Sequence, residues 1–289
     1  MFNALIVQPF GWLLRQCYNL LGNYGLAIIL FTILSKIIML PFQMKSKKSM
    51  LEMNRLQPKL KELEAKYKDD KQRYSLEVQK LYKKEGVSMF GGCLPLLITL
   101  PIMIGLYNVV RQPLTHIFGL SADTIGQIAN ALIENGVAGI EHKTGFMLEV
   151  AIASNLEKYN EIIVPIAENL KNVDFTFLGL DLSAIPNFKY ITTLWIIPAL
   201  SGFTAWLSGW LMRRAQGKQV TEQAAQTNSM MNFLMPLMSV WIAFAVPAGL
   251  GLYWIMSNVV TSAQEPILNA YYKNKMKKKE QKETTKNGK

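Results

Sequence analysis

The chain has 289 residues, with 31 Lys and Arg against 20 Asp and Glu, and half of its residues are hydrophobic. The hydrophobic residues gather in long runs, which indicates a membrane protein that crosses the bilayer several times and excludes a soluble domain with one anchor. The two cysteines and two histidines lack metal-ligand spacing, and the sequence contains no nucleotide-binding or hydrolase motif. We therefore expect no metal, no cofactor and no enzyme activity.

The amino-terminal part predicts an interfacial helix followed by a span with an unusual cation. Residues 1–21 alternate apolar and polar positions, which is typical of an amphipathic helix on a membrane surface. The first predicted span, 22–44, carries Lys36 with Thr32 and Ser35 on the same side of the helix. A cation at the centre of a span costs about 2.5–3.5 kcal/mol and usually faces a wet cavity. The alternative is a lysine near the membrane edge that reaches water through its methylene stem.

Residues 45–86 are predicted to form a cytoplasmic hairpin of two helices that meet at Asp69 and Asp70. Apolar residues recur before that point at alternating three- and four-residue spacing, as in a coiled coil. These residues are Met53, Leu56, Leu60, Leu63 and Tyr67. The stripe is either the seam of the hairpin itself or a docking surface for another protein.

Four further spans and three connecting or terminal segments complete the chain. In chain order these are the second span 87–112, the external segment 113–189 with short amphipathic helices, the third span 190–212, the cytoplasmic loop 213–228, the fourth span 229–246, the fifth span 250–268 and the basic tail 269–289. The fifth span is more polar than lipid contact favours, because it includes Tyr253, Trp254, Ser257, Asn258 and Thr261. The sequence thus predicts an all-α polytopic membrane protein with five transmembrane helices.

The distribution of charge predicts which side of the membrane each segment faces. Residues 45–85 carry thirteen Lys and Arg against seven Asp and Glu, whereas residues 111–189 carry five against nine. Basic loops stay in the cytoplasm, so we expect the amino terminus outside and the carboxyl terminus inside. The tail, with eight lysines and two glutamates, is expected to lack regular structure and to contact anionic lipid or ribosomes, not a specific nucleic acid.

Several motifs in order along the chain resemble the YidC-type membrane protein insertases and their mitochondrial Oxa and chloroplast Alb relatives. They are Tyr24-Gly25-Leu26, the run from Thr32 to Pro41, Leu56-Gln57-Pro58-Lys59, the run from Leu81 to Glu85, Gly91-Gly92-Cys93-Leu94-Pro95 with Pro101-Ile102, and the run from Pro247 to Asn258. The chain resembles a Gram-positive-type member, since we expect no large periplasmic domain.

The resemblance implies five spans around a hydrophilic groove that is open to the cytoplasm and to lipid. Lys36 stands where the family usually has arginine, and the family's late third-span glutamine corresponds to Gly209 or Ser208. Lys36, Thr32 and Trp254 match groove positions of the family. Four further polar residues close to them in sequence are added to the predicted groove. These are Ser35, Tyr253, Ser257 and Asn258.

The implied function is membrane protein insertion and chaperoning in the bacterial plasma membrane. The groove draws in polar or acidic tails of a substrate and releases its apolar segment into lipid. The implied partners are newly made membrane proteins, the Sec translocon, the signal recognition particle receptor, the ribosome and anionic lipids.

Two other classes of protein stay open from the sequence, a small-solute pore or transporter and a structural scaffold. The predicted spans contain no Asp or Glu except Glu265 at the cytoplasmic end of the fifth, which disfavours an ion-coupled transporter. A scaffold would tolerate the loss of Lys36.

Overall fold

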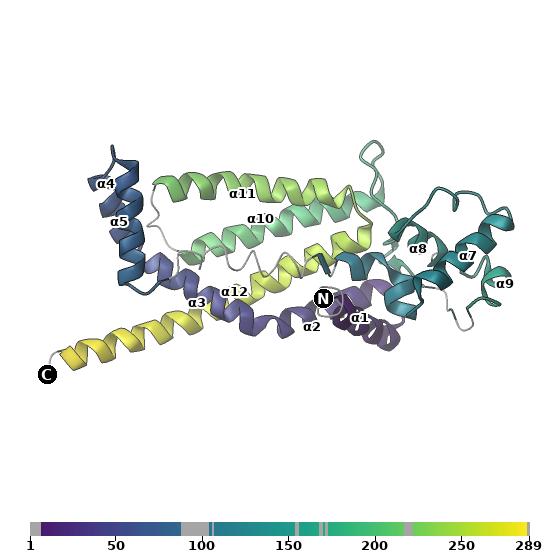
Figure 1. Ribbon diagram of the computed structural model, residues 1–289, viewed down its shortest axis with the longest axis horizontal. Helices are drawn as coiled ribbons and strands as arrows, with labels where there is room; N and C mark the ends of the chain where they lie inside the picture. Colours follow the sequence, from purple (N-terminus) through teal and green to yellow (C-terminus); the bar gives the residue numbers. More distant parts are fainter. Residues whose placement is uncertain are drawn as a thin grey trace. The chain divides into compact units, whose positions relative to one another are not determined.

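The computed structural model describes residues 7–87, 104–105, 107–153, 156–167, 170, 173–216 and 222–287 (Figure 1). The chain divides into two compact units. The first unit comprises Met1–Ser35, Leu100–Gly202 and Ser239–Ser257, and the second comprises Lys36–Thr99, Phe203–Met238 and Asn258–Lys289.

The described residues are mostly helical. In chain order the helices are α1 (Gln8–Leu21), α2 (Tyr24–Ile38), α3 (Leu40–Arg55), α4 (Gln57–Lys66), α5 (Lys71–Lys84), the π-helix η3 (Leu114–Phe118), α7 (Ala122–Glu134), α8 (Phe146–Ala153), α9 (Asn160–Ile163), the 3-10 turn η4 (Thr193–Trp195), α10 (Ile196–Gln216), α11 (Glu222–Ala243) and α12 (Ala248–Asn287). Strand β1 (Thr176–Phe177) pairs antiparallel with β2 (Leu180–Asp181).

Long apolar helices among the described residues agree with an all-α membrane protein. The helix over Thr193–Arg214 is long and apolar enough to cross a membrane, and α2 with α3 forms a second candidate that bends by 56°. Phe233–Ala243 is a shorter apolar helix. Most of the predicted second span lies outside the described residues, so the number of five spans stays a prediction.

The bend between α2 and α3 has a cause in the sequence. Pro41 occupies the first turn of α3, which begins at Leu40. Proline has no backbone N–H, and its ring clashes with the preceding helical turn. The predicted span 22–44 is therefore two helices.

The carboxyl-terminal helix is longer than the sequence predicted. We expected residues 269–289 to lack regular structure, but α12 continues through them to Asn287 as one helix of 40 residues (Figure 1). Lys, Glu and Gln are strong helix formers, and extending an existing helix needs no new nucleus. A basic composition alone therefore did not identify a disordered tail.

Helices α4 and α5 lie side by side in the second unit. Lys59 near the start of α4 forms an ion pair with Glu85 just after α5, which makes the two helices antiparallel. The side chain of Asp70 accepts a hydrogen bond of 2.9 Å from the backbone N–H of Arg73 and so caps the start of α5. Leu60 of the predicted seam is buried.

In the first unit, α1 and α7 bury apolar faces in a common core. Leu14 of α1 and Ile128 and Leu132 of α7 are fully buried there. Ser121 caps the start of α7, because its hydroxyl accepts a hydrogen bond from the backbone N–H of Thr124 at 3.1 Å. Short amphipathic helices were predicted in the external segment 113–189, and α7 is a helix of that segment with one buried apolar face.

A buried carboxylate joins α8 to η3 in the same unit. Glu149 accepts hydrogen bonds from the backbone N–H and the hydroxyl of Thr115, at 3.0 and 2.8 Å. Burial raises the pKa of the Glu149 carboxyl, although the bonds from Thr115 act in the opposite direction. Burial also lowers the pKa of the neighbouring His116 to about 4, so that imidazole is neutral at physiological pH.

The β1–β2 hairpin holds the start of α2. The backbone N–H of Tyr24 donates to the carbonyl of Asp174 at 3.2 Å, and the amide of Asn23 donates to the carbonyl of Thr176 at 2.9 Å. A Cβ on Gly25 would lie 2.4 Å from the Phe177 ring. Glycine at this position therefore lets the strand approach the helix closely.

We expect Gly25→Ala to lower the free energy of unfolding by about 1–3 kcal/mol, because its methyl group overlaps the Phe177 ring. Gly126→Ala in α7 is the matched control, since open space surrounds Gly126. It should leave stability unchanged or raise it by up to about 1 kcal/mol. Thermal unfolding of the purified protein in detergent measures both, and equal effects would contradict the docking of Phe177.

Candidate functional site

Lys36 is half-buried near the end of α2, in the second unit. Its Nζ donates a hydrogen bond of 3.0 Å to the Thr261 hydroxyl of α12. Within the part of the chain that the structure describes, no carboxylate lies within ion-pair distance of Lys36. The hydroxyl is neutral, so the contact orients the ammonium group without cancelling its charge.

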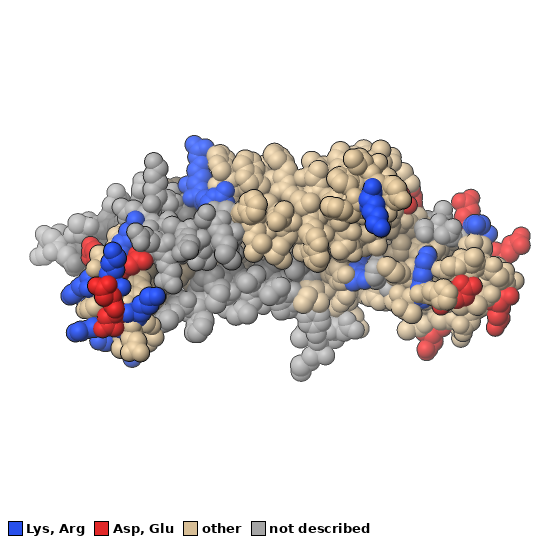
Figure 2. Space-filling view, turned by 90° about the horizontal axis from the view of Figure 1, so that it is seen from above, with Lys and Arg blue, Asp and Glu red and all other residues tan. Residues whose placement is uncertain are grey.

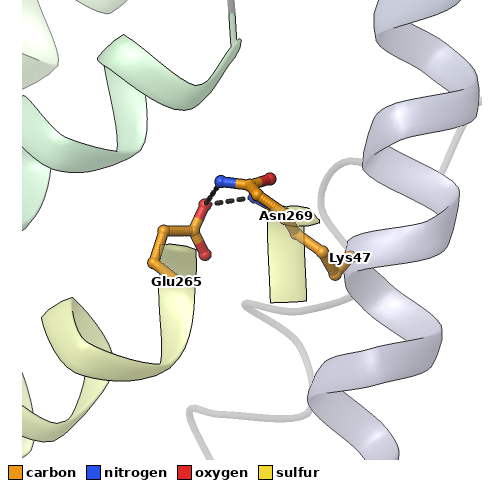
Figure 3. Close-up of polar contacts among 3 residues, drawn as sticks. All are labelled: Lys47, Glu265 and Asn269. Carbon is orange, nitrogen blue, oxygen red and sulfur yellow. Dashed lines mark hydrogen bonds and ion pairs between the residues drawn. The ribbon is translucent and has the colours of Figure 1, made fainter. Parts of the chain in front are cut away.

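A second lysine of the same unit is neutralised. Lys47 of α3 forms an ion pair with Glu265 of α12, and only 4% and 9% of these side chains are exposed. Asn269 Nδ2 donates to the same carboxylate oxygen of Glu265 at 3.3 Å. Figure 3 shows both nitrogens directed at this oxygen. We call Lys47, Glu265 and Asn269 the Lys47 cluster.

Thr261 and Glu265, which bind Lys36 and Lys47, share one face of α12 with Asn269. Thr261, Glu265 and Asn269 follow one another at intervals of four residues, so their side chains lie along one stripe of the helix. The sequence singled out Thr261 and Glu265 only as polar residues of the last span, and it missed Lys47 and Asn269. The four-residue spacing was the available signal.

The two predicted hydroxyl residues of α2 donate their hydrogen bonds to backbone carbonyls of the same helix. Thr32 and Ser35 are buried in the first unit. Thr32 Oγ1 donates to the Ile28 carbonyl at 2.6 Å, and Ser35 Oγ donates to the Thr32 carbonyl at 2.9 Å. These bonds are a common way for a helix in a membrane to satisfy a small polar residue.

The predicted residues of α12 divide between the two units. In the first unit, Tyr253 is buried and hydrogen-bonds with Ser257, while Trp254 packs half-buried against the core. In the second unit, Asn258 Nδ2 donates to the Thr204 hydroxyl of α10 at 3.3 Å. A single groove that contains all seven predicted residues stays a prediction.

No group of three or more His, Cys, Asp or Glu among the described residues is arranged to hold a metal ion. The polar contacts described above for the second unit involve ammonium, hydroxyl, carboxylate and amide groups. Such groups can bind and orient a polar or charged segment by hydrogen bonds and charge.

Comparison with known proteins shows the family. The model of the 60Kd inner membrane protein family matches residues 16–278. Membrane protein insertase YidC of Fusobacterium nucleatum is 29% identical over 261 residues, which are 90% of this chain and 93% of the relative. The chain belongs to this family, that of YidC, Oxa and Alb, and the resemblance in its motifs is confirmed.

Other relatives are longer than this chain. YidC of Cellvibrio japonicus is 30% identical over 265 residues, which are 91% of this chain and 35% of the relative. Inner membrane ALBINO3-like protein 2, chloroplastic, of Chlamydomonas reinhardtii is 30% identical over 251 residues, which are 87% of this chain and 51% of the relative. The chain thus spans about a third to a half of these two proteins and nearly all of the Fusobacterium one.

We expect Glu265→Gln to lower the free energy of unfolding by about 3–5 kcal/mol, because it leaves the Lys47 ammonium buried without a counter-charge. The double variant Lys47→Met/Glu265→Leu should recover most of this loss, since it removes both charges. Thermal unfolding in detergent is the measurement.

The matched control is Glu52→Gln, which breaks the exposed pair of Lys48 and Glu52, 3.7 Å apart. This change should cost about 0–1 kcal/mol. If Glu265→Gln is as mild as Glu52→Gln, the Lys47 cluster does not support the second unit.

Proposed function

We propose that this protein is a membrane protein insertase, which moves newly made membrane proteins into the bilayer and helps them to fold. Membership of the family supports the proposal, because the relatives from Fusobacterium and Cellvibrio carry that name. The observation that carries it is the charge of Lys36, which is half-buried on an apolar helix and bonded to a hydroxyl instead of a carboxylate.

The uncompensated charge suits a substrate with an acidic outer tail. The tail has to cross the hydrocarbon layer, where carboxylates lose their hydration. Attraction between unlike charges is stronger where water is scarce, so Lys36 lowers the barrier for an acidic group that approaches it. The apolar segment of the substrate then moves sideways into lipid, and no covalent chemistry is needed.

Buried polar atoms of α3 and α12 that lack hydrogen-bond partners among the described residues support this mechanism. Asn54 Nδ2, Gln264 Oε1 and Asn269 Oδ1 of the second unit are buried and have no hydrogen-bond partner among the described residues. Buried polar atoms in proteins are nearly always satisfied by protein or by water. Water in the proposed groove supplies the missing partners and shortens the apolar path of a substrate tail.

The distribution of charge supports the orientation that we propose, with five spans, the amino terminus outside and the α4–α5 pair in the cytoplasm. Acidic side chains gather over the region of α7 to α9 (Figure 2), which belongs to the external segment. Residues 45–85, which include α4 and α5, are predominantly basic. The antiparallel α4–α5 pair is then a cytoplasmic hairpin, available to the targeting machinery, the Sec translocon or the substrate.

In the proposed orientation the basic end of α12 also lies on the cytoplasmic side of the membrane. Its lysines suit anionic lipid or ribosomal RNA through charge alone. Helical order through Asn287 spaces these charges along a rod, which suits an extended anionic surface.

Liposomes that contain only this protein test the proposed function. A short single-span substrate with an acidic outer tail should insert faster than into bare lipid. We expect Lys36→Ala to slow insertion about tenfold, the effect of about 1.4 kcal/mol on the barrier, and Lys36→Arg to retain the rate. Protease protection of the translocated tail measures insertion.

Lys48→Ala is the matched control, because Lys48 is an exposed lysine of α3. It should leave the rate unchanged. Full activity of Lys36→Ala would exclude the charge mechanism, and wild-type insertion no faster than in bare lipid would exclude the insertase itself.

A further inference from the structure

Between Leu178 and Ile191, four large apolar side chains of the first unit are largely exposed. Leu178 and Ile191 are each 85% exposed, Phe188 is 73% exposed and Tyr190 is 68% exposed. We call these four residues the apolar rim. Large exposed apolar side chains that gather on one segment of a folded unit can mark a site of contact with another phase or molecule.

Leu178 lies in a tight turn whose backbone conformation is unfavourable for a leucine. Leu178 and Gly179 form the two-residue turn between β1 and β2, with φ angles of 51° and 77°. Turns with positive φ at both positions favour Asn-Gly, because a bulky side chain clashes with the backbone there. An exposed leucine in this conformation is costly in water, and such an outlier points to a function.

The hairpin that carries Leu178 is held firmly at the starts of two helices. Phe177 packs against Gly25 at the start of α2. On the other side, the backbone N–H groups of Ala248 and Gly249 donate to the carbonyls of Ala184 and Leu182, both at 2.9 Å. The turn is therefore a fixed projection of the first unit.

An aromatic cluster fixes the rest of the rim. The rings of Phe188, Trp195 and Phe244 lie 5.0 to 6.0 Å apart between centroids. Trp195 Nε1 donates to the carbonyls of Asn187 and Tyr190, at 2.9 and 3.0 Å. These contacts hold the segment that carries Phe188 and Tyr190 in one conformation.

The rim adjoins a helix that meets the criteria for a membrane span. Ile191 is two residues before the helix over Thr193–Arg214, and β2 packs against η4 at the start of that helix. Residues that directly precede a span lie at the surface of the bilayer, where Tyr and Trp are enriched. The exposed Lys189 between Phe188 and Tyr190 suits the phosphates of lipid headgroups.

We propose that the apolar rim is embedded in the outer surface of the lipid bilayer. Leu178 and Ile191 then lie at the boundary of the acyl chains, and Tyr190 lies among the headgroups. Lipid removes the apolar side chain of Leu178 from water, which offsets the strain of its turn. The rim fixes the level of the starts of α2 and α12 in the membrane. The proposal goes beyond insertion itself and rests on the outward orientation given above.

Site-directed spin labelling of the full-length chain tests the rim. Cys17 and Cys93 are first changed to serine, and Leu178→Cys or Ile191→Cys then carries a nitroxide. The protein is reconstituted sparsely in vesicles of phosphatidylethanolamine and phosphatidylglycerol. We expect collisions with a water-soluble nickel complex to be several-fold fewer at both positions than at Glu134→Cys, an exposed position of α7, with oxygen collisions more frequent.

Equal nickel accessibility at all three positions overturns the proposal. Protection at Leu178 that rises with the ratio of protein to lipid also overturns it, since a second copy then covers the rim. Insertion activity of the labelled proteins confirms that they are folded.

A separate labelling experiment tests whether the external segment faces the outside of the cell. A membrane-impermeant maleimide, added outside intact cells, should react with Glu134→Cys. If it does not react while Leu178 is lipid-embedded in vesicles, the outward orientation fails and the lipid contact of the rim stands.

Discussion

A lysine in an apolar helix needs a polar partner, and this requirement organises the second unit. Lys36 and Lys47 lie on α2 and α3, and both reach the same stripe of α12. Thr261, Glu265 and Asn269 of that stripe supply a hydroxyl, a carboxylate and an amide at successive turns. The pairing sets the register of α12 against α2 and α3, because a shift of one residue turns the stripe away from the lysines.

The two lysines differ in whether their partners cancel their positive charge. Glu265 cancels the charge of Lys47 and accepts a hydrogen bond from Asn269, and this buried contact stabilises the second unit. Thr261 accepts a hydrogen bond from Lys36 and leaves the positive charge in place. One cation thus serves the fold, while the other stays able to attract an acidic ligand. We infer that this difference suits a protein whose substrate must enter and leave.

The family and the break between α4 and α5 followed from local sequence signals. The family was predicted from its motifs and is confirmed. The role of Lys36, predicted from its apolar surroundings, stays a prediction. Helix α4 ends at Lys66 and α5 begins at Lys71, on either side of the predicted break at Asp69 and Asp70.

Longer-range features did not follow from the sequence. The pairing of Lys47 with Glu265 joins residues 218 positions apart, and no local pattern gives the register between α3 and α12. The helical end of α12 was missed because composition was given more weight than helix propagation. The one groove that unites Thr32, Ser35 and Lys36 with Tyr253, Trp254, Ser257 and Asn258 stays a prediction.

The most direct measurement of the central claim, that Lys36 acts through an uncompensated charge, is a reciprocal exchange of charge. Insertion rates are compared for wild type and Lys36→Glu, each with one substrate that has an acidic outer tail and one in which those residues are changed to lysine. We expect wild type to prefer the acidic tail and Lys36→Glu to prefer the basic tail. The same preference in both proteins would contradict it.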